Sequence, residues 1–190
     1  MAPLGTKKTI RILGVDPGTV ACGYGVVDVP GERAAMKPRY VECGVIELDA
    51  KSPLSSRLVT LAAELREVID ELRPDELSLE AAFHGVNARS ALLLGHARGV
   101  IMLLGAEASL PIGEYPPATV KRTVAGHGRA QKTEVQRVVS WLFGLHTAPR
   151  TDAADALAIA LCHAYHRASP TLRVARSASQ PRRSVASQRA

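Results

Sequence analysis

The sequence predicts a domain of the α/β class, in which a mixed β-sheet carries helices on both faces. Two observations predict it. First, short runs rich in β-branched residues, typical of strands, follow one another near the start of the chain. Second, later runs of this kind alternate with longer segments whose apolar residues recur every three or four positions, as in helices. The composition agrees, because 46% apolar residues in a chain of 190 are enough to bury a substantial core.

Three strands are predicted near the start of the chain. The run 9–15 (TIRILGV) ends at the turn sequence DPG, and two further apolar runs, 22–29 and 40–48, follow in succession. Strands that follow one another in this way pair as a β-meander.

Helices and strands alternate in the rest of the chain. From Ser55 onward, apolar residues spaced by three and four predict a helix to Leu72, and Pro74 follows its end. The later segments are predicted to be a strand at 77–81, a helix from Asn87 to about Ala108, a strand at 112–115, a helix from about Ala118, a basic glycine-containing loop at 126–130, a helix at 132–143 and a helix from Thr151 to about His166. No internal repeat interrupts this order, so we expect one folded domain.

The formal net charge of +6 is concentrated at the C-terminus. Six arginines and no acidic residue lie from Arg167 onward, whereas residues 1–166 carry 18 basic and 18 acidic residues. We divide the chain into an N-terminal extension (1–8), a folded domain (9–167) and a basic tail (168–190). We predict that the tail is disordered, because it is rich in Ser, Ala and Pro. It either attracts nucleic-acid phosphates nonspecifically or has no specific partner.

The folded part is also divided by charge. Residues 12–81 hold 7 basic and 13 acidic residues, and residues 82–150 hold 8 basic and 3 acidic residues. A neutral sum therefore conceals an acidic first half and a basic second half.

Composition also indicates the cellular setting. No apolar run reaches the roughly 18 residues of a membrane span, and the N-terminus lacks the apolar stretch of a signal peptide. The cysteines at 22, 43 and 162 show no CxxC spacing, which is typical of reduced core thiols. The six histidines form no convincing ligand cluster, and we interpret them as structural. We predict a cytoplasmic protein with no membrane partner.

Four carboxylates stand at positions that favour a site. Asp16 ends the first strand and Glu80 lies at the end of the strand 77–81, while Asp152 and Asp155 share one face of the last helix at i, i+3 spacing. Each has a simpler alternative: a turn-forming Asp before Pro-Gly, a solvated strand edge, or acids that favour a helix N-terminus. Four such residues from distant segments nevertheless predict convergence on one crevice.

Crowded carboxylates repel one another, and a divalent cation removes that penalty. Oxygen ligands without Cys or His favour Mg²⁺ or Mn²⁺ over Zn²⁺. Two such ions are the usual arrangement for in-line phosphodiester displacement. The carboxylates therefore predict a metal site for phosphoryl chemistry.

Five segments together resemble the RuvC family of Holliday-junction resolvases, over about residues 9–166. These are GVDPGTVACGYGVVD, LSLEAAF, NARSALLLGHARGV, YPPATVKRTVAGHG and DAADALAIA. The resemblance implies a ribonuclease-H-like fold with a five-stranded mixed sheet. It implies a homodimeric crossover junction endodeoxyribonuclease that nicks four-way DNA junctions symmetrically during recombination and repair, leaving 5′-phosphates. Two Mg²⁺ ions per active site are implied, with Mn²⁺ as a substitute, and so is a partnership with a RuvA–RuvB branch-migration complex.

The resemblance also assigns residues. The family's catalytic, metal-binding carboxylates correspond to Asp16, Glu80, Asp152 and Asp155, and its basic residues to Lys121 and Lys132. The aromatic beside the catalytic glutamate corresponds to Phe83, which either stacks on an unpaired base or belongs to the core.

Further basic residues are candidate DNA contacts on physical grounds. Arg122 and Arg129 belong to the basic cluster around the glycine-containing loop at 126–130, where a phosphate can approach the backbone. Arg89 lies in the first turn of the helix 87–108. The alternative for this loop is a solvated basic surface.

The helix 87–108 is apolar on more than one face. It either packs against a second copy of the chain or lies wholly inside one subunit.

Two other function classes remain open from sequence. One is a junction-binding module without catalysis, against which the four carboxylates argue, since they would repel DNA. The other is an ATPase of the actin and sugar-kinase superfamily, which GVDPGT resembles, although such proteins need two lobes and a second phosphate loop.

Overall fold

A computed structural model describes residues 9–31, 37–81 and 88–167. The predictions for the extension 1–8, for Phe83, for the cap at Asn87 and for the tail 168–190 lie outside the described residues. The described part contains one five-stranded sheet of order β3-β2-β1-β4-β5. Its strands are β1 (Thr9–Asp16), β2 (Ala21–Pro30), β3 (Arg39–Glu47), β4 (Glu76–Glu80) and β5 (Ile112–Tyr115).

The sheet is mixed, as predicted. β1 pairs antiparallel with β2, and β2 with β3, which forms the expected meander. β4 joins β1 in parallel, and β5 joins β4 in parallel. β1 is therefore the central strand, where the antiparallel and parallel halves meet.

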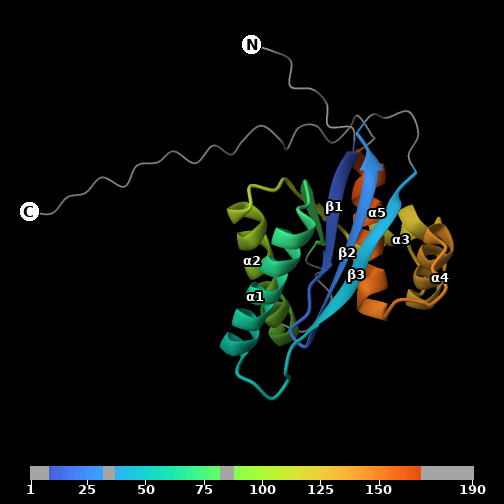
Figure 1. Cartoon of the computed structure of the whole chain (residues 1–190). Helices are drawn as coiled ribbons and strands as arrows, with labels where there is room; N and C mark the ends of the chain where they lie inside the picture. Colours follow the sequence, from blue (N-terminus) through green and yellow to red (C-terminus); the bar gives the residue numbers. More distant parts are fainter. Residues whose placement is uncertain (1–8, 32–36, 82–87, 168–190) are drawn as a thin grey trace, which may run out of the picture.

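Helices cover both faces of this sheet (Figure 1). α1 and α2 lie on one face, and α3, α4 and α5 lie on the other. The helices are α1 (Leu54–Leu72), α2 (Ala88–Glu107), α3 (Pro117–Ala125), α4 (Lys132–Phe143) and α5 (Thr151–Arg167). The predicted boundaries agree within one or two residues. α3 begins at Pro117 rather than Ala118, because the first turn of a helix tolerates a proline that lacks an N–H.

α5 packs directly on the backbone of β1 and β2, because glycines leave room for it. A Cβ placed on Gly14 would lie 2.2 Å from the carbonyl oxygen of Ala156, and one on Gly23 would lie 2.0 Å from that of Asp152. Any side chain at either position would push the helix away from the sheet. The glycines therefore bring the first turn of α5 close to the end of β1.

α2 is only partly buried, which contradicts the interpretation that it lies wholly inside one subunit. Its buried residues are Ala97, Ile101, Leu104 and Gly105. Leu92 and Leu103 are 65% and 57% exposed. In the described part of the chain, α2 is also long and apolar enough, by length and composition alone, to cross a membrane, although Arg89 and Arg98 interrupt its apolar run. Its buried face nevertheless joins the core formed by α1 and the sheet.

A buried polar network closes the end of the sheet where β4 begins. The carboxylate of Glu76 accepts hydrogen bonds from His163 Nε2 at 2.7 Å and Arg167 Nε at 2.8 Å. His163 Nδ1 lies 2.8 Å from the hydroxyl of Tyr115. Burial alone would raise the pKa of Glu76, but its hydrogen bonds and charge attraction to His163 and Arg167 outweigh burial and lower it to about 2. This histidine is structural, as expected.

Candidate active site

Asp16 and Glu80 lie side by side at the carboxyl ends of two parallel strands. The register of β1 and β4 pairs Val15 with Leu79, so the next residue of each strand stands at the same edge of the sheet. That edge is where open α/β sheets bind ligands. The sequence prediction for these two residues is therefore supported by the topology.

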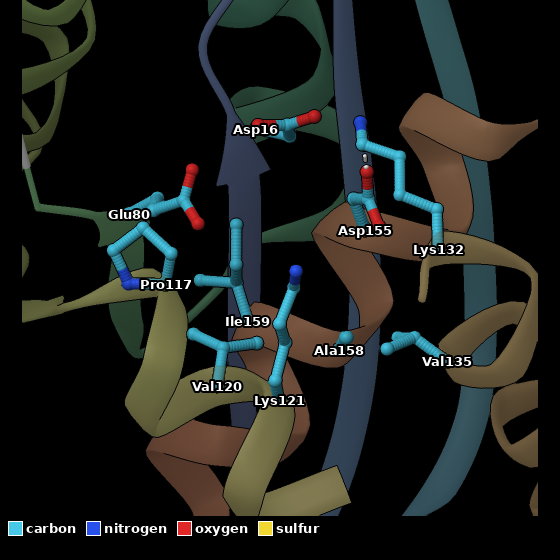
Figure 2. Close-up of a pocket in the computed structure, with 10 residues that line it drawn as sticks. All are labelled: Asp16, Glu80, Pro117, Val120, Lys121, Lys132, Val135, Asp155, Ala158 and Ile159. Carbon is cyan, nitrogen blue, oxygen red and sulfur yellow. Dashed lines mark hydrogen bonds and ion pairs between the residues drawn. The ribbon is translucent and has the colours of Figure 1, made fainter. Parts of the chain in front are cut away.

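The N-terminal part of α5 brings a third carboxylate, Asp155, to the same place. Asp155 lines a pocket of about 80 Å³ together with Asp16 and Glu80. Figure 2 shows these side chains above the ends of α3 and α5. The other residues that line the pocket are Pro117, Val120, Lys121, Lys132, Val135, Ala158 and Ile159. Three carboxylates from β1, β4 and α5 thus share one small cavity with two lysines.

The electrostatics of this pocket are those of an incompletely neutralised acidic cluster. Burial, followed by the nearby charges of Asp155 and Glu80, raises the pKa of Asp16 to about 7. Burial also raises the pKa of Glu80, followed by the charge of Asp155. The ionised forms of these carboxyls are therefore unfavourable until a cation joins them.

The two lysines offset part of this negative charge. Lys132 Nζ donates a hydrogen bond to Asp155 Oδ2 at 2.8 Å. This bond raises the pKa of Lys132, and the surrounding aspartates add to the shift. Lys121 comes from α3, and its ammonium group points toward the carboxylates (Figure 2). Both lysines predicted from the sequence thus lie in the pocket.

Asp152 is set apart from the other three carboxylates. It does not line the pocket, and its main chain packs against Gly23. Its charge still contributes, as the smallest of the causes that raise the pKa of Asp16. Within the residues that the structure describes, no three His, Cys, Asp or Glu side chains are arranged to hold one ion. Mutual repulsion, together with the contact of Lys132 on Asp155, accounts for this open arrangement.

The predicted arginine contacts lie outside the pocket. Arg89, Arg122 and Arg129 are all exposed, and none of them lines the cavity. Arg122 lies in the last turn of α3, and Gly126 ends that helix in the left-handed conformation with φ of 85°. The basic loop therefore follows directly from a helix that lines the site.

One residue beside the site escaped the sequence analysis. Arg98 of α2 donates hydrogen bonds to the main-chain oxygen of Glu80 and to the carboxylate of Glu114. In the sequence, Arg98 is visible as a cation within an otherwise apolar helix segment. The sequence does not show which groups would accept its hydrogen bonds.

Comparison with known proteins identifies the family. Residues 12–163 match the family described as crossover junction endodeoxyribonuclease RuvC. The chain belongs to the RuvC family. A RuvC from Halorhodospira halophila is 47% identical over 160 residues, covering 84% of this chain and 93% of that protein. A RuvC from Magnetococcus marinus is 43% identical over 164 residues, covering 86% and 89%.

Solved structures agree with this membership. The structure of Thermus thermophilus RuvC in complex with Holliday junction substrate is 36% identical, with a TM-score of 0.76 over 84% of this chain and 95% of that one. The ribonuclease-H-like fold and the endonuclease class predicted from the sequence are thereby confirmed. RuvC proteins are a metal-dependent family, which agrees with the acidic pocket. Membership in this family also rules out the ATPase alternative.

Proposed function

We propose that this chain, as a homodimer, resolves Holliday junctions by paired symmetric nicks that leave 5′-phosphates, in recombination and DNA repair. The observation that carries the proposal is the pocket in which Asp16, Glu80 and Asp155 meet Lys121 and Lys132. The likeness to a RuvC whose structure holds Holliday junction substrate supports the same substrate here. A protein acting on chromosomal DNA in a bacterial-type pathway belongs in the cytoplasm.

The donor set fits divalent magnesium. Asp16, Glu80 and Asp155 offer only oxygen atoms, which suit Mg²⁺ and Mn²⁺. Burial makes the uncompensated charge of Asp16 and Glu80 unfavourable. We assign these three, with Asp152 from the same helix turn as Asp155, as the residues that hold two ions. When bound, the two ions would supply a nucleophilic water at neutral pH and stabilise charge on the leaving 3′ oxygen.

The lysines have a separate role in this proposal. Lys132 holds Asp155 in the protein without DNA. Once cations neutralise the carboxylates, its ammonium group is available to the scissile phosphate, and Lys121 approaches the same space from α3. Both side chains would then position the phosphate and balance charge that develops on it.

The rest of the DNA contact surface is assigned by exposure and charge. Arg89, Arg122 and Arg129 are exposed cations that can reach DNA phosphates without entering the pocket. Phe83 follows the catalytic glutamate by three residues, and we assign it to stacking on an unpaired base near the crossover.

We assign the outer face of α2 to the homodimer contact. Leu92 and Leu103 expose apolar surface there that a second copy would bury. A two-fold dimer presents two equivalent sites, as the two equivalent strands of a junction require. The RuvA–RuvB branch-migration complex is the further partner that family membership suggests.

The test is cleavage of a synthetic four-way junction in Mg²⁺ or Mn²⁺, with the cuts mapped on all four strands. We expect paired nicks at symmetric positions with 5′-phosphate ends, and little cutting of a linear duplex. Asp155→Asn should abolish the nicks, while Asp70→Asn, on the exposed side of α1, should not. Metal-independent binding without cleavage would instead support the junction-binding module.

A further inference from the structure

Arg98 connects α2 to the strand end that carries Glu80. Its side chain is 12% exposed. One guanidinium nitrogen donates to the main-chain oxygen of Glu80, and the other donates to Glu114 Oε2 at 2.5 Å. A single side chain from the α1–α2 layer thus contacts the backbone of a pocket residue and the neighbouring strand.

These two acceptors lie at the ends of adjacent parallel strands. The register pairs Leu79 with Glu114 and Glu80 with Tyr115, where both β4 and β5 end. β4 has five residues and β5 has four, and β5 is the edge strand of the sheet. Beyond this point, a backbone hydrogen bond from Ala81 N–H to the Tyr115 oxygen at 2.8 Å continues the pairing. Strand ends this short are prone to fray, so a buried side-chain clamp has a large effect on their position.

We propose that Arg98 is a positioning residue that holds the end of β4, and with it the Glu80 carboxylate, in the place required for metal binding. The inference rests on the proposed function, since it assumes that Glu80 is a metal ligand. Arg98 acts through the main chain and touches neither DNA nor metal. Outer groups that orient metal ligands typically change metal affinity or activity by 10–100-fold when they are removed.

The chemistry of arginine suits this position. A guanidinium group offers donors in a fixed plane, so it can serve a carbonyl and a carboxylate at once. Lysine offers a single point charge and would hold one acceptor well and the other poorly. A comparison within the molecule is Arg66, which pairs with Glu107 between α1 and α2, with both side chains 51% exposed. Such exposed pairs contribute little to stability, and this one contacts no pocket residue.

The experiment compares Arg98→Met and Arg98→Lys with the matched control Arg66→Met. Calorimetric titration of the metal-free proteins with Mn²⁺ gives metal affinity without any DNA. Junction cleavage across a range of Mg²⁺ concentrations gives the metal midpoint, and a thermal melt confirms folding. We expect Arg98→Met to lose about 10-fold or more in Mn²⁺ affinity and to raise the Mg²⁺ midpoint in parallel. The loss of Mn²⁺ affinity in Arg98→Lys should be several-fold smaller than in Arg98→Met. Arg66→Met should match the wild type in both Mn²⁺ affinity and Mg²⁺ midpoint.

Wild-type Mn²⁺ affinity and an unchanged Mg²⁺ midpoint in folded Arg98→Met would overturn the proposal. If that variant does not fold, Glu114→Gln and Arg98→Lys decide, because each keeps the contact with the Glu80 main chain possible while weakening the clamp. Wild-type metal affinity in both would also overturn it, and a reduced affinity in either would support it. Failure of the wild type to cut junctions would refute the proposed function instead, and the Mn²⁺ titrations would still test Arg98.

Discussion

The two glutamates of β4 show how one strand serves two purposes. Glu76 begins the strand and Glu80 ends it. Hydrogen bonds from His163 and Arg167 outweigh burial and lower the pKa of Glu76 to about 2, whereas burial and Asp155 raise the pKa of Glu80. The partners of Glu76 outweigh its burial, whereas the cations near Glu80 do not outweigh burial and the charge of Asp155.

α5 repeats this contrast along its length. Its N-terminal part brings Asp155 to the acidic pocket, and its last turns bring His163 and Arg167 to Glu76. At the end near Glu76, the negative charge is neutralised within the fold, and this pairing contributes to stability. The other end leaves its carboxylates only partly neutralised, and under the proposed function metal ions complete the neutralisation, so the cost in stability there serves the site.

The largest effect is expected at the functional end of the domain, where Asp16, Glu80 and Asp155 line the pocket. Asp16→Asn should lower junction cleavage by about 10³-fold or more, because a bound metal contributes several kcal/mol to the transition state. Junction binding, measured by gel shift, should persist, since the variant removes negative charge where phosphate binds. Loss of binding together with loss of the folded melt would instead assign Asp16 to the fold.

The second-largest effect is expected at the structural end of the domain, where Glu76 pairs with His163 and Arg167. Glu76→Gln should destabilise the domain by about 3 kcal/mol at pH 7, because it leaves the partly buried Arg167 guanidinium without its carboxylate. The folded pKa of Glu76 is lowered, so its stabilisation is present above about pH 4.5 and is lost as the pH falls toward 2. Urea unfolding at pH 7 and at pH 3 should show the gap between variant and wild type narrowing. Cleavage well below the melting temperature should remain near wild type, and a selective loss of cleavage would contradict the division between the two ends.

Particular residues show how far sequence reasoning reaches. The meeting of Asp16 and Glu80 follows from two strand ends in one parallel pair, which the order of elements predicts. Helix spacing likewise predicts that Asp155 and Asp152 share one face, and the structure places Asp155 in the pocket while the charge of Asp152 acts on Asp16 from beside it. Pairing of Glu76 with His163, 87 positions away, follows from no local pattern. Only the packed geometry of the layers identifies such distant partners.

A smaller effect is expected in the pH dependence of the metal-free protein. The folded pKa of Asp16 is raised to about 7, so the stability linked to its protonation is fully present below about pH 4 and is lost as the pH rises through 7. The free energy of unfolding should therefore fall by about 1–3 kcal/mol between pH 5 and pH 8, and by less in Asp16→Asn. Adding MgCl₂ should restore stability at pH 8 more than at pH 5, because protonated carboxyls bind metal poorly. Equal stabilisation by MgCl₂ at both pH values would contradict a metal site built on Asp16.

The smallest effect on cleavage is expected from the basic tail. Deletion of 168–190 removes five arginines but keeps Arg167, whose pairing with Glu76 belongs to the structural end. Arg167 contacts Glu76 at the start of β4 and does not line the pocket at the other end of that strand. The deletion should weaken nonspecific duplex binding at low salt and make that binding less salt-dependent, while junction cleavage stays within about twofold. A second deletion that also removes Arg167 should lower the melting temperature, which the first should not. If the shorter deletion abolished metal-dependent cleavage in a folded protein, the tail would be part of the catalytic machinery, and the contrast between the two ends of the domain would no longer account for function.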